Sequence, residues 1–492
     1  MVKPVLALLS VVGVALGSSP SQWTTGDAWS AYDAPADGFS AVGALSAVQT
    51  SAFTSFSHPL FPKYSARIKQ TEWCDSTVNA YTGYIDIEAR HLFFYFFESR
   101  SKPSEDPVVL WTNGGPGCSS SLGLLMELGP CRVTNATGKP EFFAEGWNDQ
   151  ANVFFIDQPI NVGYSYSQFG ETVYTTEEAA IDVAKFVFLF FENFPQFKGR
   201  AFHMAGESYG GRYIPLFAAA VYDQNALLEA NGYDTINLAS AIIGNGMTDP
   251  ASMVESYYDM TCTAASVFPV LPISTCVRMK KALPRCHKWV KEACIDQFDS
   301  MNCEAASAFC SSEITAPYFA TGLNYYDISQ PCEDRANLCY SVTAEISGYL
   351  SRPDVREMLG VDSHVPPVFS SCNNDINAGF HAADDSLRAS TAQVGALLER
   401  GVRVLIYVGT YDWICNWVGN ERWTRALEWS GQQAFNAEPM RNWTVGEEKA
   451  GITRSAKGFT FATVDAAGHM VPYDKPKQAL AMVNRWLNAT SL

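Results

Sequence analysis

A serine framed by glycines stands in the stretch HMAGESYGG, at residues 203–211. The pattern Gly-x-Ser-x-Gly is typical of a sharp turn between a strand and a helix, because glycines let neighbouring backbone approach where a side chain would collide. Such a turn presents the hydroxyl of Ser208 as a nucleophile. Glu207 stands directly before it. A carboxylate there would hinder a reaction that develops negative charge, unless this acid binds something.

A serine nucleophile needs a histidine base and an acid that orients it, and in the fold that carries this turn the acid and then the base follow the serine. Among the histidines after Ser208, only His469 follows an apolar, strand-like run, in FATVDAAGHMVP. We therefore predict His469 as the base. The other candidates lie in cysteine-rich or loop-like sequence: His287, His364 and His381.

The orienting acid is expected just beyond the preceding strand-like run, VRVLIYVG. Asp412, in GTYDWICNW, meets this condition, and its carboxylate could hold the imidazole tautomer and stabilise the imidazolium. Asp465 is a rival that stands closer to His469 along the chain, where a loop role is more typical.

Acyl transfer also needs two backbone N–H groups that bind the oxyanion of the tetrahedral intermediate. One belongs to the residue after the nucleophile, Tyr209, and the other to a glycine-rich loop after an early strand. The stretch WTNGGPGCSS, at residues 111–120, supplies that loop. Gly115 is the predicted second donor.

The elements that must position these residues are short apolar runs ending in Gly, Asn, Asp or Ser, separated by helical stretches such as 177–194 and 212–230. This alternation predicts an α/β fold with a mostly parallel central sheet covered by helices on both faces, and ligands at the carboxyl ends of the strands. A hairpin is expected over residues 81–99. The strand-like runs are PVVLWTNGG, NVFFIDQP, AFHMAGES, INLASAIIGNG, VRVLIYVGTYD and FTFATVDAAGH.

A cysteine-rich stretch interrupts this alternation and is predicted to be a cap inserted into the sheet domain. Thirteen cysteines are present, and those of the dense stretch form no Cys-x-x-Cys pair, so we expect disulfides rather than a zinc site. An odd count leaves at least one thiol unpaired within the chain. No metal or cofactor is expected. The predicted parts are a core over 67–246 and 345–492, with the cap at 247–344.

The N-terminal residues predict entry into the secretory pathway. Residues 1–17 have the profile of a signal peptide, and residues 18–66 resemble a leader or pro-segment. The vacuole and the cell exterior both remain open as destinations. Three sequons fit this route, at Asn135, Asn442 and Asn488.

The charge balance limits the partners. With 51 acidic and 34 basic residues the net charge is −17, which repels nucleic acid and anionic membrane surfaces. No stretch after the signal peptide is a candidate membrane helix.

Several motifs occur together in one order: NGGPGCSS, ELGP, DQPINVGYSYS, GESYGG, IGNGMTDP, CNWVGN and GHMVP. In these the chain resembles the serine carboxypeptidase family over about residues 81–487. The resemblance implies an α/β-hydrolase fold and release of single residues from peptide C-termini. It assigns the same triad, Ser208, Asp412 and His469, and the same oxyanion donors, Gly115 and Tyr209.

The resemblance also implies a site for the terminal carboxylate of a peptide, formed by Asn113, Gly114, Glu127 and Glu207. Close like charges raise at least one pKa, so a glutamic acid kept protonated can donate a hydrogen bond to that carboxylate. Peptide cleavage is then expected to be best in acidic solution. An apolar pocket would favour hydrophobic residues, with walls from Leu125, Met126, Ile414, Cys415 and Met470.

The family pattern further implies five disulfides and a free thiol at Cys415. It leaves Cys74 and Cys131, which we expect to pair with each other. The five implied pairs are Cys118–Cys372, Cys262–Cys276, Cys286–Cys310, Cys294–Cys303 and Cys332–Cys339.

Two other functions remain open: an acyltransferase on the same scaffold, and a non-catalytic binding protein with the hydrolase fold. The turn around Ser208, called the elbow below, reads GESYGG and favours the peptidase, because the elbow of such acyltransferases commonly resembles GDSYSG. The presence of all triad candidates disfavours a non-catalytic binding protein. The expected partners are peptides with a free C-terminus. Whether the chain is a monomer or a homodimer is left open.

Overall fold

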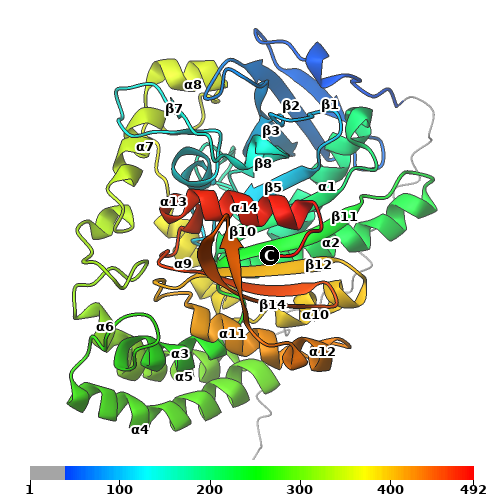
Figure 1. Cartoon of the computed structure of the whole chain (residues 1–492). Helices are drawn as coiled ribbons and strands as arrows, with labels where there is room; N and C mark the ends of the chain where they lie inside the picture. Colours follow the sequence, from blue (N-terminus) through cyan, green and yellow to red (C-terminus); the bar gives the residue numbers. More distant parts are fainter. Residues whose placement is uncertain (1–38) are drawn as a thin grey trace, which may run out of the picture.

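The structure, a computed structural model, describes residues 39–492. One mixed sheet runs through the molecule in the order β1-β2-β3-β4-β8-β5-β10-β11-β12-β15-β14-β13, with β9 beside β4 (Figure 1). Its centre is parallel, as the sequence predicts. The parallel strands are β8 (Asn152–Ile156), β5 (Val108–Thr112), β10 (Phe202–Ser208), β11 (Leu238–Gly246), β12 (Arg403–Gly409) and β15 (Phe459–Val464).

Both edges of the sheet are antiparallel. The expected hairpin over 81–99 forms β3 (Ala80–Ile87) and β4 (Arg90–Phe97), whereas the pair at the far edge, β13 (Arg441–Val445) and β14 (Glu448–Ala456), is not anticipated from the sequence. The remaining short strands are β9 (Tyr166–Ser167) and a separate pair, β6 (Cys131–Arg132) and β7 (Glu141–Phe142).

Part of the expected leader, residues 18–66, lies within this sheet. β1 (Thr54–Ser57) pairs with β2 (Tyr64–Thr71), which pairs in turn with β3. The side chains of Phe56 and Phe61 are buried in the core. The expected signal peptide, residues 1–17, falls outside the described residues.

Helices cover both faces of the sheet, and its central strands are therefore buried on both sides. One core cluster holds the apolar side chains of α1 (Thr176–Asn193), α2 (Gly210–Ala230) and α10 (Thr391–Glu399). The opposite cluster holds those of α7 (Val342–Leu350), α8 (Pro353–Leu359) and α14 (Pro476–Leu487).

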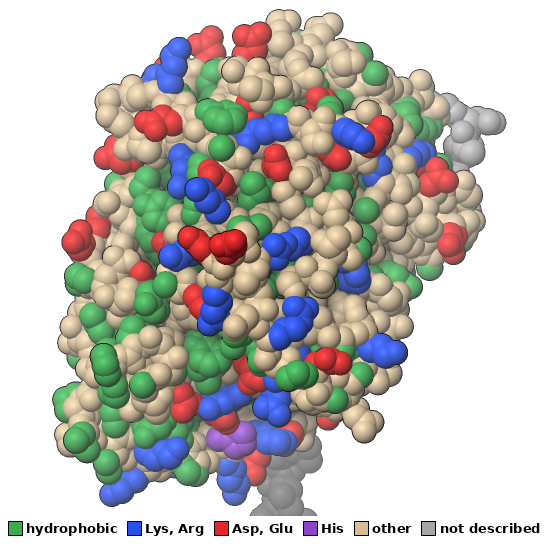
Figure 2. Space-filling model, viewed as in Figure 1, with side chains coloured by type: hydrophobic (Ala, Val, Ile, Leu, Met, Phe, Trp, Pro, Cys, Tyr) green, Lys and Arg blue, Asp and Glu red, His purple; other side chains and the backbone are tan. Residues whose placement is uncertain are grey.

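The cysteine-rich stretch folds into helices at one end of the molecule, drawn at the lower left of Figure 1. Three disulfides lie within this stretch, and apolar side chains gather on that part of the surface in Figure 2. Within the stretch, Phe268 and Ile273 are more than four-fifths exposed. The helices are α3 (Pro250–Cys262), α4 (Ile273–Val290), α5 (Ser300–Cys310) and α6 (Ala316–Phe319). The other α-helices of residues 39–492 are α9 (Asn374–Ala382), α11 (Trp417–Ala426), α12 (Gln432–Ala437) and α13 (Val471–Asp474).

The structure contains six disulfides, and they are the six pairs expected from the sequence and the resemblance. Cys74 is bonded to Cys131, and Cys415 is the free, buried cysteine of the described chain. The other pairs are Cys118–Cys372, Cys262–Cys276, Cys286–Cys310, Cys294–Cys303 and Cys332–Cys339.

The three sequon asparagines, Asn135, Asn442 and Asn488, are exposed. Within residues 39–492, no helix combines the length and the apolar character that crossing a membrane requires.

A buried ion pair anchors the helix that follows Ser208. Arg212 of α2 lies 3.3 Å from Asp385, and both side chains are at most 3% exposed. Asp385 also accepts hydrogen bonds from the Tyr209 hydroxyl at 2.6 Å and from the Thr176 hydroxyl at 2.6 Å. This carboxylate therefore joins the starts of α1 and α2.

Replacing Asp385 with alanine is expected to lower the free energy of unfolding by about 3 kcal/mol, because Arg212 and two hydroxyls lose a buried partner. Chemical denaturation measures this change. As a matched control, Asp375→Ala removes an exposed carboxylate of α9 and should cost at most about 0.5 kcal/mol. Equal stabilities of the two variants would contradict the role given to Asp385.

Candidate active site

Ser208 ends β10 in a backbone conformation that few side chains adopt. Its φ angle is 60°, in the left-handed region, and α2 begins at Gly210. The flanking backbone leaves no room for side chains: a Cβ at Gly206 would lie 2.7 Å from the Thr112 carbonyl oxygen, and one at Gly211 would lie 2.6 Å from the Met247 nitrogen. The turn predicted from HMAGESYGG is thus present, and close packing holds it.

His469 and Asp412 meet at the ends of two adjacent strands. His469 follows β15, Asp412 follows β12, and His469 Nδ1 lies 2.8 Å from Asp412 Oδ2. Both side chains are buried. A carboxylate that accepts the Nδ1 proton leaves Nε2 as the basic nitrogen, as a general base requires. The rival acid, Asp465, instead lies 2.9 Å from Lys449 at the surface.

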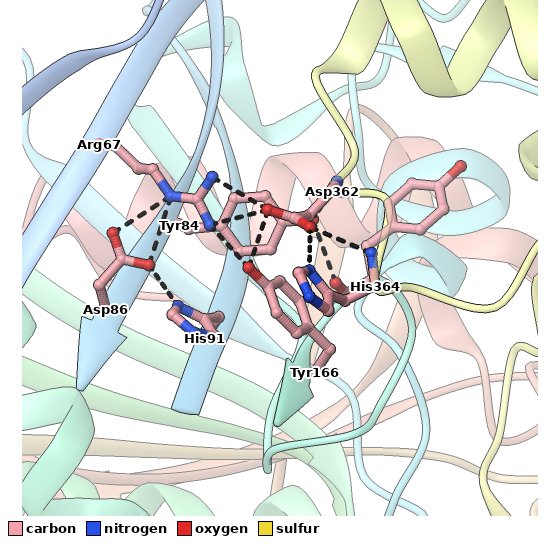
Figure 3. A network of polar contacts seen from close by, with 8 residues as sticks. Arg67, Tyr84, Asp86, His91, Tyr166, Asp362 and His364 are labelled. Carbon is pink, nitrogen blue, oxygen red and sulfur yellow. Dashed lines mark hydrogen bonds and ion pairs between the residues drawn. The ribbon is translucent and has the colours of Figure 1, made fainter. Parts of the chain in front are cut away.

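The other histidines considered as bases have different partners. His287 contacts Glu255 in the helical insertion, and His381 Nδ1 lies 2.7 Å from the Ser386 hydroxyl. His364 belongs to a polar network in which Arg67 joins Asp86 to Asp362 (Figure 3). This network ties β2 and β3 to the loop after α8.

Two residues that contact the predicted acid and base were not singled out from the sequence. Asn245, at the end of β11, donates from Nδ2 to Asp412 Oδ2 at 2.8 Å, and its Oδ1 accepts from the Gly409 nitrogen at 3.2 Å. The backbone carbonyl of Tyr326 accepts a hydrogen bond from the backbone nitrogen of His469 at 2.7 Å. The centroids of the two side-chain rings lie 4.8 Å apart. Asn245 stands in the motif IGNGMTDP, which could have indicated it, whereas Tyr326 comes from the cysteine-rich stretch and carries no such signal.

The glycine-rich loop packs directly on the elbow. A Cβ at Gly114 would lie 2.3 Å from the Tyr209 nitrogen and 2.8 Å from Ser208 Cβ, so only glycine fits there. Gly115 has a φ of +114°, a conformation that glycine adopts readily. The loop thus brings the backbone of Gly115 close to that of Tyr209, at the carboxyl ends of β5 and β10.

Asn113, Glu127 and Glu207 form one buried cluster beside Ser208. Asn113 Nδ2 donates to Glu207 Oε1 at 2.9 Å and to Glu127 Oε1 at 3.2 Å. Its Oδ1 accepts from Trp111 Nε1 at 2.8 Å and from the Gly123 nitrogen at 2.9 Å. Since those two groups are donors only, they fix the amide with its NH₂ toward the carboxyls.

Glu127 and Glu207 lie side by side, because Asn113 Nδ2 donates to one oxygen of each carboxyl. Two ionised carboxyls buried at this separation would repel each other, which favours a proton on one of them. Burial raises the pKa of Glu207 well above its usual value, and the charge of Glu127, the hydrogen bond to it and the charge of Asp412 raise it further. Burial also raises the pKa of Glu127, but hydrogen bonds from Glu207 and Asn113 oppose that rise. The raised pKa of Glu207 therefore favours its protonated form in acidic solution.

The expected pocket residues come from three segments. Leu125 and Met126 are buried in a π-helical turn, Gly123–Glu127, that ends at the carboxyl cluster, and Met470 follows the base. Ile414 and Cys415 follow Asp412.

Cys415 also lies near the acid and the base. Asp412, Cys415 and His469 place possible ligand atoms within 4.8 Å of one another, a spacing that a metal site would also need. Burial raises the pKa of the Cys415 thiol well above its usual value, with the charges of Asp412 and Glu207 adding to the effect. A metal would require the thiolate, and His469 Nδ1 is already bonded to Asp412, so the donor set suits a triad better than a metal.

Comparisons with known proteins agree with this geometry. The family model "Serine carboxypeptidase" matches residues 70–489. Carboxypeptidase Y of Candida albicans is 44% identical over 431 residues, which cover 87% of this chain and 77% of that protein. Carboxypeptidase Y homolog A of Sclerotinia sclerotiorum is 43% identical over 436 residues, which cover 87% of this chain and 77% of that protein.

Among solved structures, a prohormone-processing carboxypeptidase of Saccharomyces cerevisiae, Kex1Δp, matches with a TM-score of 0.72 and 26% identity, covering 85% of this chain and 93% of that one. The family match spans the elbow, the glycine-rich loop, the acid and the base. The chain therefore belongs to the serine carboxypeptidases, enzymes with the α/β-hydrolase fold.

Proposed function

We propose that the protein releases single residues from the C-terminus of peptides through an acyl-enzyme on Ser208. The observation that carries this proposal is the buried cluster of Asn113, Glu127 and Glu207 beside the elbow. An endopeptidase or esterase has no use for a proton-bearing carboxyl pair next to its nucleophile. Binding the free carboxylate of a peptide C-terminus gives such a pair a role, because that carboxylate accepts hydrogen bonds and is repelled by ionised acids.

The reaction begins when His469 takes the proton of the Ser208 hydroxyl and the oxygen attacks the last peptide carbonyl. Asp412, held by Asn245, stabilises the imidazolium, and the N–H groups of Gly115 and Tyr209 bind the oxyanion. His469 then gives the proton to the leaving amine, and a water molecule, deprotonated by the same imidazole, hydrolyses the acyl-enzyme.

The terminal carboxylate is bound by Asn113, the backbone of Gly114 and the acid form of Glu207, with Glu127 as the acceptor that orients the Glu207 proton. Leu125, Met126, Ile414, Cys415 and Met470 form apolar walls, which favour hydrophobic side chains beside the scissile bond.

The proposed setting is the secretory pathway, with delivery to the vacuole or the exterior. A leader that extended to residue 66 would include β1 and the first residues of β2. Removal of β1 would expose Phe56 and the edge of β2, so we place the end of any cleaved leader before residue 54.

An organophosphorus serine reagent is expected to label Ser208 alone, and Ser208→Ala should lower kcat for a blocked dipeptide by about 10⁶-fold. Peptide mapping locates the label. His469→Ala should abolish labelling, whereas His364→Ala, in the polar network of Figure 3, should leave it unchanged. Labelling at another serine, or full activity of Ser208→Ala, would refute the assignment.

Glu207→Ala is expected to raise KM for a blocked dipeptide by about 10- to 100-fold, because a hydrogen bond to a charged group contributes about 1.5–3 kcal/mol. For the wild type, KM should rise as the pH increases and Glu207 ionises, since its raised pKa keeps the binding form dominant in acid. Glu207→Gln, which cannot ionise, should bind the dipeptide in acid and lose less affinity toward neutral pH.

A blocked amino-acid ester is the matched substrate, because it offers no terminal carboxylate. Its KM should be insensitive to both substitutions at Glu207. If the dipeptide and the ester showed the same pH profile, the carboxyl cluster would have no part in substrate binding.

A further inference from the structure

A second concave surface lies away from the strand ends that carry the catalytic residues. It is a groove of about 890 Å³ between the end of β2, the start of β7 and helices α7 and α8. Figure 1 shows β7, α7 and α8 at the upper left of the molecule. Its volume falls in the range of ligand sites. None of its lining residues belongs to the active site.

The groove combines aromatic rings with polar side chains. Trp73 and Tyr349 are buried in its wall, where Trp73 Nε1 donates to the Tyr349 hydroxyl at 2.9 Å. Phe142 lines it and is 57% exposed. Polar groups surround these rings. The lining therefore matches a ligand that has both apolar ring faces and many hydroxyl groups, and saccharides have this chemistry. The polar lining includes Gln70, Asn79, Lys139 and Asp354.

One rim of the groove is the loop that carries the first sequon. Gly138, Lys139 and Pro140 line the groove, and the Gly138 nitrogen donates to the Asn135 carbonyl at 3.2 Å. The disulfide Cys74–Cys131 ties the groove wall to β6, the strand from which this loop departs. Asn135 therefore stands one turn away from the groove.

Helix α7 and the residues after it hold this loop in place. The Ala136 nitrogen donates to Glu345 Oε2 at 2.7 Å, and Arg352 Nη1 donates to the carbonyls of Thr137 at 3.1 Å and Gly138 at 2.9 Å. A Cβ at Gly348 would lie 2.8 Å from Ala136 Cβ, so the loop packs closely on α7. The position of Asn135 relative to the groove is thus fixed.

The sequon itself is folded as a turn. Asn135 Oδ1 accepts from the nitrogen and from the hydroxyl of Thr137, both at 2.9 Å, and the Asn135 side chain is exposed. The amide is therefore held by its oxygen, and its nitrogen is the atom that an Asn-x-Thr sequon offers to a glycan.

We propose that an N-linked glycan on Asn135 lies in this groove, with a sugar ring against Phe142 and its hydroxyl and acetamide groups bonded to the polar rim. The inference requires the secretory route but not the proposed peptidase chemistry. Asn135 Nδ2 bonds to the anomeric carbon of an N-acetylglucosamine, the lipid-linked diphosphate leaves with the electron pair, and the amide loses one proton. The glycan then covers the part of the Phe142 ring that remains exposed, since the Arg100 guanidinium already lies over the ring, 4.3 Å from its centroid.

The test is the rate at which a glycosidase releases each glycan from the folded protein, produced through a secretory host and followed by mass spectrometry of the glycopeptides. The reference site is Asn442, which is exposed on the edge strand β13. We expect release from Asn135 to be several-fold slower than from Asn442. Phe142→Ala should remove that difference, and Phe142→Tyr, which keeps the ring, should retain it.

Absence of a glycan at Asn135, or equal release rates at the two sites of the wild type, would overturn the proposal. Because Phe142 is exposed, its replacement should leave the fold intact, and unchanged cleavage of an ester substrate checks this. A second measurement needs no variant: amide hydrogen exchange in residues 70–79 and 138–142 should speed up when the glycan is trimmed from the wild type. Unchanged exchange would equally contradict a glycan in the groove.

Discussion

The buried cluster of Asn113, Glu127 and Glu207 disfavours two negative charges, because ionised carboxyls that are buried side by side repel each other. Both carboxyls are buried, and burial together with the charges of Glu127 and Asp412 raises the pKa of Glu207 well above its usual value. The identity of the residue before the nucleophile follows from this constraint. In the proposed function a carboxyl beside Ser208 is no obstacle, because it is neutral when substrate arrives and becomes a hydrogen-bond donor.

The scaffold maintains this cluster through the ends of adjacent parallel strands. Asn113 directly follows β5, and β10 carries Glu207 and Ser208. The amide of Asn113 is oriented by donors from its own strand end and from the turn that carries Glu127. Asp412 follows β12, two strands from β10, and His469 follows β15, the next strand of the sheet. Strain in the backbone of Ser208 is sustained by contacts that leave no space for a side chain at Gly114, Gly206 or Gly211.

Much of this arrangement was predictable because strand ends carry strong local signals. Apolar runs ending in Gly, Asn or Asp predict the parallel centre of the sheet. The place of Asp412 just beyond a strand-like run favours it over Asp465, which the structure pairs with Lys449. The carboxyl cluster was expected only through the family resemblance. The spacing between Glu127 and Glu207 says nothing about proximity until β5 and β10 are known to be neighbours.

Other features depend on contacts that a sequence does not express. β1 and β13 are short strands of four and five residues, and the nine residues of β14 do not alternate between apolar and polar side chains. The expected leader, residues 18–66, includes β1, whose pairing with β2 is a tertiary contact. Tyr326 reaches His469 from a distant, cysteine-rich segment, and Asn245 acts through the strand that separates Ser208 from Asp412. Both are tertiary contacts, and only the folded chain brings these groups together.

The most direct test of the central claim observes the proton on Glu207. Difference infrared spectroscopy of the wild type against Glu207→Gln, in mildly acidic solution without substrate, isolates the carbonyl stretch of that one side chain. The account predicts a band of a protonated carboxylic acid in the wild type that the variant lacks. A difference spectrum that contains only ionised carboxylate bands would contradict it.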